Sequence, residues 1–264
     1  MAIGANFVVL GMCKLVILGT GTLSWHLYRA FSQAKGVNLI QLVGRNKGAL
    51  GEFPGDVPKT DDFNAIMEAD IYLIAVKDDA IGEVSRALSD RSGLVVHSSG
   101  TVDMEALETP NRGVFYPLQT FSREREVDFG QIPICIEAER AESLELLKSL
   151  AATLTKEVHE MDSRKRKKLH LAAVIVNNFT NYLYGVGHEI CVSQGLSFNL
   201  LKPLILETAL KVQDISPEQA QTGPARRGDQ GTIERHLETL HDPKIIGLYG
   251  LLSESIKNEY EEKL

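Results

Sequence analysis

The sequence of 264 residues has little of several features that mark particular classes of protein. Its three cysteines, Cys13, Cys135 and Cys191, are odd in number and lie far apart, with none in a metal-spaced pair. These positions argue against a disulfide framework or a metal site and predict reduced thiols in a cytoplasmic protein. No apolar run approaches the ~20 residues that a membrane span needs, so we expect no membrane partner.

The chain also lacks an excess of positive charge. Its net charge of −7 argues against a nucleic-acid partner, because phosphate binding needs a basic face. The one basic run, residues 164–168, stands at the start of a predicted helix and is interpreted as a solvated helix end. With 44% hydrophobic and 24% charged residues, the composition is that of a globular protein, and the length favours two domains.

A short segment near the N-terminus carries the strongest functional signal. The apolar run 15–18 leads directly into Gly19 and Gly21, and an amphipathic stretch follows. This strand–turn–helix order is typical of a dinucleotide-binding unit, in which Gly19 allows the tight turn and Gly21 lets a pyrophosphate approach the helix N-terminus. Ser24 stands in place of the usual third glycine, and its small side chain still lets the helix approach the strand. The alternative is a glycine turn in a scaffold that has lost its ligand. The residues expected to contact the cofactor here are Gly19, Thr20, Gly21, Thr22 and Leu23.

The order of predicted elements indicates the fold class. Strand-like runs recur at residues 15–18, 39–43, 71–76, 94–97, 114–116, 132–136 and 157–159. Helical stretches separate them at residues 23–34, 63–69, 80–88, 104–107 and 143–154. Such alternation predicts an α/β, Rossmann-like domain with a mostly parallel sheet, spanning residues 1–161. Residues 162–264 form an all-α helical domain, with helices over 163–193, 200–213, 232–240 and 243–263. Asp162 or Ser163, Ser216 and Asp242 are expected to cap them.

The end of the second predicted strand indicates which cofactor binds. A carboxylate at this position would hold the ribose 2′-hydroxyl of NAD, whereas the sequence offers Arg45 and Asn46. Because a guanidinium can bind a 2′-phosphate, we expect NADP, although Arg45 could also be a surface arginine in a turn. Val76, Lys77 and Ser99 follow later strands and are expected to line the same groove.

Polar residues that end the run 94–97 are candidates for catalysis. His97 could donate a proton and Ser98 could hydrogen-bond a substrate carbonyl, imine or carboxylate. A polar turn that only caps the following helix is the alternative. Gln119, after the run 114–116, is a candidate ligand for a substrate or for the nicotinamide amide.

The long predicted helix and a later loop supply the remaining candidates. His170 and Asn177 share a polar stripe with Asn181, Tyr184 and His188, which could line a cleft or form a structural network or a dimer seam. We expect His170 and Asn177 to be catalytic and His188 to be structural. The candidates for substrate binding are Gln119, Asn178, Arg226 and Arg227. The two arginines could instead be salt-bridged in a surface turn.

Taken together in this order, the motifs at residues 19–21, 44–46, 97–100, 116–121, 170–179 and 222–229 resemble one bacterial family. It is described as a family of NADP oxidoreductases in which a Rossmann-like domain precedes a helical domain of unknown function. The fold is similar to that of pyrroline-5-carboxylate reductase and the hydroxyacid dehydrogenases, whose helical domains dimerise and complete the active site. Hydroxyacid dehydrogenases of this fold place a catalytic lysine one helical turn before an asparagine, where this chain has Ala173 and Val174.

The sequence therefore predicts an NADP-dependent oxidoreductase that transfers a hydride to a small imine or carbonyl compound in an interdomain cleft. The missing lysine makes imine reduction the more plausible chemistry, and the helical domain is expected to form a homodimer. The alternative is a catalytically silent protein that binds NADP or a partner on a reductase scaffold.

Overall fold

The structure, a computed structural model, describes residues 12–261, which divide after Asn178 into two compact units. The predicted domain boundary after Met161 lies close to the start of α5 (Ser163–Ala173). The first turns of α5 are bonded to the sheet, as described below, and this helix therefore belongs to the first unit. Each unit is described by itself.

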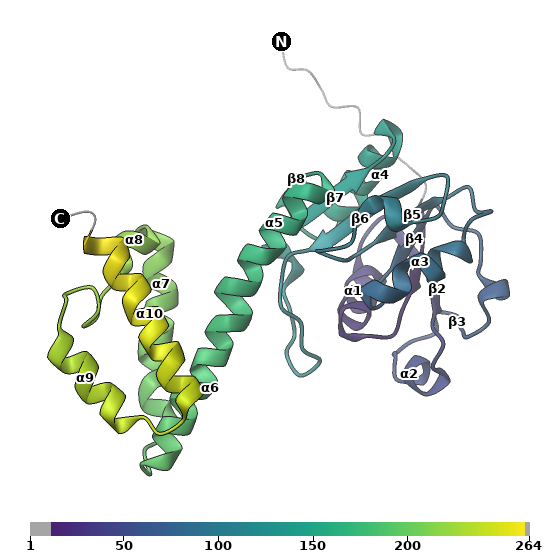
Figure 1. Cartoon of the computed structure of the whole chain (residues 1–264). Coiled ribbons are helices and arrows are strands. Elements are labelled where there is room, and N and C mark those ends of the chain that lie inside the picture. Colours follow the sequence, from purple (N-terminus) through teal and green to yellow (C-terminus); the bar gives the residue numbers. More distant parts are fainter. Residues whose placement is uncertain (1–11, 262–264) are drawn as a thin grey trace. The chain divides into compact units, whose positions relative to one another are not determined.

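The first unit contains one eight-stranded sheet with the order β3-β2-β1-β4-β5-β6-β7-β8 (Figure 1). Neighbouring strands are parallel except β6 and β7, so the predicted Rossmann-like, mostly parallel sheet is confirmed. The strands are β1 (Cys13–Leu18), β2 (Val37–Val43), β3 (Lys59–Thr60), β4 (Ile71–Ile74), β5 (Leu94–His97), β6 (Arg112–Pro117), β7 (Ile134–Ala138) and β8 (Val158–Glu160).

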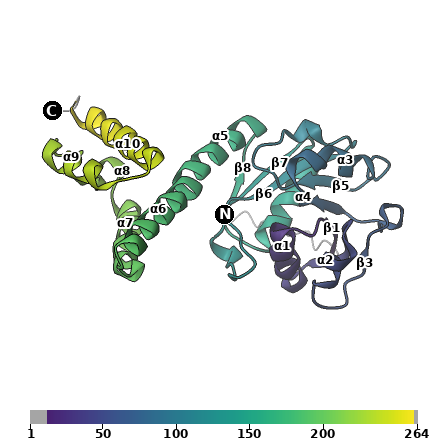
Figure 2. The same cartoon turned by 60° about the horizontal axis from the view of Figure 1, so that its bottom comes forward.

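Both faces of the central strands are buried, because alternate side chains pack into two different cores. Leu15 and Ile17 of β1 belong to the core beneath α1 (Thr22–Gln33) and α4 (Ala141–Ala152). Val16 and Leu18 of the same strand pack on the side of α3 (Ile81–Arg86). The helices on the two sides are visible in Figure 2. Continuous apolar runs in the sequence thus correspond to strands that are covered by helices on both faces.

Short turns complete the first unit, and two of them correct the sequence prediction. The expected helices over 63–69 and 104–107 are single 3₁₀ turns, Phe63–Ala65 and Met104–Ala106. The remaining short elements are α2 (Lys47–Gly51) and the 3₁₀ turns Asp78–Ala80 and Phe129–Gln131.

The long helix predicted over 163–193 is continuous, but its centre is not α-helical. Residues Val174–Phe179 form a π-helical segment between α5 and α6 (Thr180–Ser193). A π-helical turn holds an extra residue, so positions before and after it do not continue one stripe at offsets of three and four. The single polar stripe predicted from His170 to His188 is therefore interrupted at this segment.

The second unit is helical, as predicted. It contains α6, the 3₁₀ turn Phe198–Leu201, α7 (Lys202–Asp214), α8 (Pro217–Ala220), α9 (Gln230–Thr239) and α10 (Pro243–Glu261). The last two residues of the expected helix 243–263 lie outside the described residues. The Ser216 hydroxyl forms a capping box at α8, and carboxylates of Asp162 and Asp242 accept backbone N–H bonds at their helices, so these predicted caps are confirmed.

Burial differs between the two units. In residues 179–261 the buried hydrophobic side chains are Cys191, Ala225 and Ile233. Leucines of the same unit are exposed, among them Leu200, Leu204 and Leu251, each more than 60% exposed. Within residues 12–261, no helix combines the length and the apolar character required to cross a membrane.

Candidate functional site

A groove of about 960 Å³ lies at the carboxyl ends of four parallel strands of the first unit. Its walls are the turns that follow β1, β2, β4 and β5, namely residues 19–23, 44–46, 76–80 and 98–101. The strand order reverses between β1 and β4, so the groove stands where open α/β sheets bind their ligands. Tyr116 and His170 line one of its ends.

The turn after β1 requires glycine at its first position. Gly19 has φ +134°, and a Cβ there would lie 2.1 Å from the carbonyl oxygen of Ala75. The Gly19 N–H donates to the Val43 carbonyl over 2.8 Å, which joins the turn to β2. The predicted tight turn therefore exists because the chain passes against two neighbouring strands at once.

The helix that follows presents its N-terminus to the groove. No side chain caps α1, its first turn holds no acidic residue, and a Cβ on Gly21 would meet nothing within 4 Å. Free N–H groups at a helix start favour an anion, and the space over Gly21 is open to one. Ser24, in place of the third glycine, is fully buried and donates to the Ala75 carbonyl over 2.9 Å. Its hydroxyl thus holds the helix against β4.

Arg123, which no sequence motif singled out, contacts this turn with its side chain. The Arg123 guanidinium donates to the Thr20 carbonyl over 3.1 Å, forms an ion pair with Glu52, and lies 5.2 Å from the Trp25 ring centroid. Arg123 lies about a hundred residues from the turn in the sequence, and no local pattern indicated the contact.

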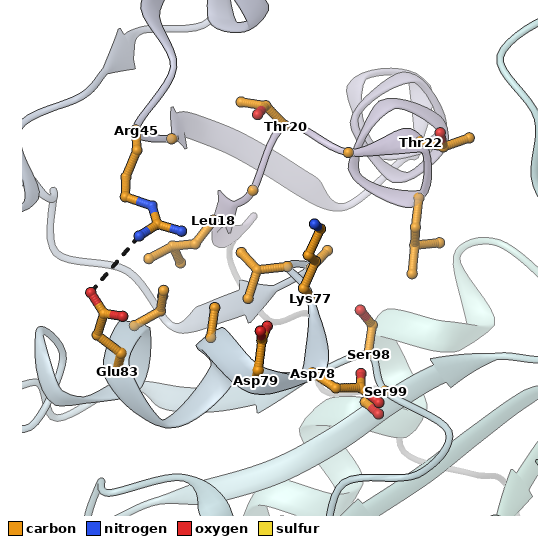
Figure 3. A pocket seen from close by; sticks show the side chains of 18 of the residues that line it. Leu18, Thr20, Thr22, Arg45, Lys77, Asp78, Asp79, Glu83, Ser98 and Ser99 are labelled. Carbon is orange, nitrogen blue, oxygen red and sulfur yellow. Dashed lines mark ion pairs between the residues drawn. The ribbon is translucent and has the colours of Figure 1, made fainter.

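The tip of β2 places Arg45 on the groove wall, where its side chain is 69% exposed. Figure 3 shows the guanidinium facing Glu83, and the two groups lie 3.9 Å apart. Asn46 also lines the groove, but its side-chain oxygen accepts from Ala49 N–H and caps α2. Gly44 is required by packing, because a Cβ there would lie 2.5 Å from Thr20 Cγ2.

The turn after β4 contributes both signs of charge. Val76, Lys77 and Asp79 line the groove, and in Figure 3 the Lys77 side chain extends toward the glycine turn. The neighbouring Asp78 carboxylate accepts a hydrogen bond from the Thr101 hydroxyl. This bond ties the turns after β4 and β5 together.

The three polar residues predicted at the end of β5 lie in two different environments. Ser98 and Ser99 line the groove, whereas His97 does not and is fully buried. The Ser98 hydroxyl donates to the Ile74 carbonyl over 3.3 Å. The Ser99 hydroxyl accepts from the N–H groups of Thr101 and Val102, so it shapes the turn.

The prediction that His97 donates a proton is not supported by its surroundings. Its Nδ1 accepts from the Ser99 N–H over 3.1 Å. Burial, and next the positive charge of Arg166, lower the pKa of His97 to about 4. A neutral, enclosed imidazole supports the turn, and we assign His97 that structural role.

His170 reaches the groove from α5, and Tyr116 reaches it from β6. Their side chains form a hydrogen bond of 2.9 Å between Tyr116 Oη and His170 Nδ1. Burial raises the pKa of Tyr116 to about 12. Gly100 packs on the imidazole so closely that a Cβ there would lie 2.4 Å from Nδ1.

One arginine of the basic run 164–168 is buried and joins the start of α5, the helix that carries His170, to the sheet. Arg166 is 1% exposed, forms an ion pair of 2.5 Å with Glu137 of β7, and donates to the Val102 carbonyl. Ser163 also donates to Glu137, over 2.7 Å. The interpretation of this run as a solvated helix end is therefore wrong for Arg166, which joins α5 to the sheet.

A second hollow, of about 340 Å³, adjoins these residues and also belongs to the first unit. Apolar side chains line it together with Gln119, Thr120, Asn177 and Asn178. The π-helical segment presents both asparagines to this hollow, although neighbouring residues of an α-helix diverge by about 100°. In the part of the chain that the structure describes, no Asp, Glu, Lys or Arg lines this hollow.

The two predicted arginines lie in the second unit and differ in their surroundings. Arg226 is bonded within that unit, to the carbonyls of Gln219 and Gln221, and stacks 4.9 Å from the Tyr260 ring centroid. Arg227 is exposed. The structure thus uses Arg226 to hold its own loop.

Comparisons with known proteins agree with this description. The family model for a domain of unknown function (DUF2520) matches residues 132–256. A structure described as a putative NADP oxidoreductase from Bacteroides fragilis is 40% identical, with a TM-score of 0.86, and the alignment covers 93% of this chain and 98% of that one. The search of curated proteins found no match.

Two further structures show how widely the fold occurs. A protein from Thermotoga maritima is 24% identical, with a TM-score of 0.71 and coverage of 94% of this chain and 99% of that one. The pyrroline carboxylate reductase of Plasmodium falciparum, solved with NADP bound, is 15% identical, with a TM-score of 0.60 and coverage of 95% and 93%. At the identity to the Bacteroides fragilis protein and over nearly the whole of both chains, this chain belongs to the same family of NADP oxidoreductases.

Proposed function

We propose that the chain binds NADP in the groove and reduces the C=N or C=O bond of a small uncharged compound in the adjoining hollow. One observation carries this proposal. The groove runs from an arginine at the tip of β2, past an uncapped helix N-terminus, to a hydrogen-bonded tyrosine and histidine that also line the hollow.

The residues of the groove fit a dinucleotide with a 2′-phosphate. The N–H groups at the start of α1 would bind the pyrophosphate, together with the backbone of residues 20–23. Arg45 would hold the 2′-phosphate, because β2 ends without the carboxylate that selects NAD. Asn46, Val76, Lys77 and Ser99 complete the expected contacts. When bound, the reduced cofactor supplies the hydride.

The second hollow suits the substrate. Its lining is apolar apart from amide, hydroxyl and imidazole groups, so it favours a neutral group that can form hydrogen bonds. Gln119 and Asn178 would bind the substrate, and Asn177 would orient the reacting bond. Within residues 12–261, no lysine or arginine lines this hollow, so the protonated imidazole of His170 would be the one cation there for a substrate carboxylate. Arg227 is exposed and stays a predicted substrate ligand.

Proton delivery is assigned to His170. Ser98 lines the groove, but its hydroxyl hydrogen is donated to the Ile74 carbonyl, so Ser98 could serve the reacting group only as an acceptor or after this bond is broken. Ala173 and Val174 stand where hydroxyacid dehydrogenases place a lysine, so the chain's own proton donors at this end are the imidazole and the phenol. Reduction of an imine requires only that nitrogen take up one proton.

We also propose that the second unit pairs with a second copy of the chain. Its helices expose leucines such as Leu200, Leu204 and Leu251, which a neighbouring surface would normally cover. Twofold pairing of identical chains is the commonest way to cover such a surface. Light scattering at micromolar concentration would give the mass of a dimer, and Leu204→Glu would give that of a monomer.

The cytoplasm remains our predicted location. Cys13, Cys135 and Cys191 are free thiols in the structure. Burial raises the pKa of Cys13 and Cys135 to about 11, which keeps both thiols protonated.

A fluorescence titration tests the cofactor. Trp25, the only tryptophan, lies on α1 directly behind the glycine turn. Excitation of Trp25 should give energy transfer to bound NADPH at micromolar concentration, more weakly with NADH, and Arg45→Ala should weaken NADPH binding by about 10–100-fold. Calorimetry that detects neither nucleotide would contradict the proposal. NADPH binding without its consumption by any imine or carbonyl compound would favour the silent binding protein.

A further inference from the structure

The groove and the hollow share two lining residues, Tyr116 and His170. Hydride transfer brings the cofactor and the substrate's reacting bond together, so a proton donor for that bond is expected where the two cavities meet. Within residues 12–261, this pair alone occupies that position. Tyr116 comes from the end of β6 and His170 from α5, 54 residues later.

The imidazole of His170 has one enclosed edge and one open edge. Its Nδ1 lies 2.9 Å from Tyr116 Oη, and Gly100 packs against Nδ1, Cγ and Cβ. The Tyr116 and His170 rings meet edge to face, with centroids 5.9 Å apart. Nε2 lies across the ring from this enclosed edge, and the side chain is only partly buried. Nδ1 is therefore closed to a substrate, whereas Nε2 is available.

We infer that Tyr116 determines which ring nitrogen of His170 exchanges a proton with the substrate. The Tyr116 oxygen accepts a hydrogen bond from Nδ1–H, and Nε2 exchanges its proton with the substrate. This inference rests on the proposed function, in which His170 is the proton donor. Tyr116 acts through His170 and is a positioning residue that sequence reasoning did not assign.

The proton and electron balance is complete with these groups. The substrate carbon accepts a hydride, whose electron pair forms the new C–H bond while the π pair of C=N moves onto nitrogen. The nitrogen takes the proton from Nε2 of the His170 imidazolium, which becomes a neutral ring that still donates Nδ1–H to Tyr116. Water then returns a proton to Nε2. The raised pKa of Tyr116 means that the phenol keeps its own proton throughout.

The hydrogen bond between Tyr116 Oη and His170 Nδ1 is compatible with a neutral ring that carries its proton on Nδ1, and the inference requires that form. An imidazole without a fixed partner favours Nε2–H, so the Nδ1–H form requires an acceptor at that nitrogen. Among the residues that the structure describes, Tyr116 is the one hydrogen-bond partner of Nδ1. Its own O–H is left to bond in the cavities that the tyrosine lines.

Nitrogen NMR of the free full-length protein tests the inference without a substrate. The signals of His170 are assigned by their loss in His170→Gln, and the neutral ring is measured at a pH about two units above the ordinary imidazole value. We expect Nδ1–H in the natural protein and Nε2–H in Tyr116→Phe. Tyr28→Phe is the matched control, because it removes another buried phenol, bonded to Pro54, and should leave His170 unchanged.

A second variant keeps the test decisive if Tyr116→Phe folds poorly. In Gly100→Ala the new methyl group must displace the imidazole from Tyr116, so the ring should also revert to Nε2–H. With any imine that the natural protein reduces, Tyr116→Phe should lower kcat by about tenfold and leave KM within about twofold.

The outcomes separate this inference from the proposed function. An Nε2–H ring in the natural protein, or an unchanged Nδ1–H ring in Tyr116→Phe, would overturn the inference even if NADPH binds. Absence of NADPH binding in the titration would overturn the proposed function, whichever tautomer is found.

Discussion

The two ends of the groove are built in different ways. At one end, where we propose that the phosphates bind and which we call the phosphate end, the lining residues follow one another in the turn after β1. Only glycine fits at position 19 there, because a Cβ would collide with the Ala75 carbonyl. At the other end, where we propose that His170 delivers the proton and which we call the proton end, Gly100, Tyr116 and His170 come from three separate segments of the chain. They meet only in the folded unit. A local motif thus defines the first end, whereas long-range packing defines the second. The sequence is informative about the first for this reason.

A single methyl group added at Gly19 is expected to disrupt the phosphate end. Gly19→Ala places a Cβ against the Ala75 carbonyl at positive φ, so we expect a loss of about 2–4 kcal/mol in the free energy of unfolding and no measurable NADPH binding. Urea unfolding and the Trp25 titration measure the two effects.

Gly21→Ala is the matched control for that variant. Among the described residues, no atom lies within 4 Å of the added Cβ, so stability should change little. NADPH affinity should fall, because the methyl group would occupy space expected for the pyrophosphate. Unchanged affinity in Gly21→Ala would show that the dinucleotide does not approach this turn.

Near the proton end, the buried His97 at the end of β5 is expected to make the stability of the protein depend on pH. The pKa of this buried imidazole is lowered to about 4, whereas the unfolded chain titrates near its ordinary value of 6.5. The unfolded state therefore binds more protons between these values, and stability falls as the pH drops from 6.5 toward 4. We expect a loss of about 2 kcal/mol between pH 7 and pH 5 from this residue.

Urea midpoints at the two pH values measure this effect. His97→Asn removes the titrating group, so its stability should depend less on pH than that of the natural protein, even if it is lower at both values. An equal pH dependence in the two proteins would mean that His97 does not titrate in this window.

The contrast between the two ends also explains what could be predicted from the sequence. The mostly parallel sheet and the glycine turn follow from local patterns, because alternating apolar runs and turn residues indicate them, and Arg45 lines the groove as predicted. The bond between Tyr116 and His170 joins residues 54 positions apart, and no periodicity encodes such a pair. Arg166 was misread for the same reason, since a basic run gives no sign of which member meets Glu137. The π-helical segment Val174–Phe179 was also missed, because the apolar and polar spacing was interpreted at the period of a regular α-helix.

Arg123 is far in the sequence from the other residues of the phosphate end, which follow one another in the turn after β1. It donates to the Thr20 carbonyl, and in a trans peptide the Gly21 N–H points to the side opposite this carbonyl. Arg123→Met should leave the fold intact and weaken NADPH binding by about tenfold, because the turn loses its fixed orientation. Arg29→Met, which removes a similar exposed ion pair with Glu126, is the control and should have no effect. Equal affinities in the two variants would show that the turn holds its shape without Arg123.

The smallest expected effect concerns Glu83. Its pair with Arg45 belongs to the exposed part of the phosphate end and not to the glycine turn. Its carboxylate lies 3.9 Å from the Arg45 guanidinium, and both side chains are mostly exposed. Such a pair contributes less than about 1 kcal/mol and weakens with salt. Because Glu83 would compete with a 2′-phosphate for Arg45, Glu83→Gln should tighten NADPH binding about two- to threefold at low salt and leave NADH binding unchanged. Calorimetry with both nucleotides measures this, and an equal gain for NADH would place the 2′-phosphate away from Arg45.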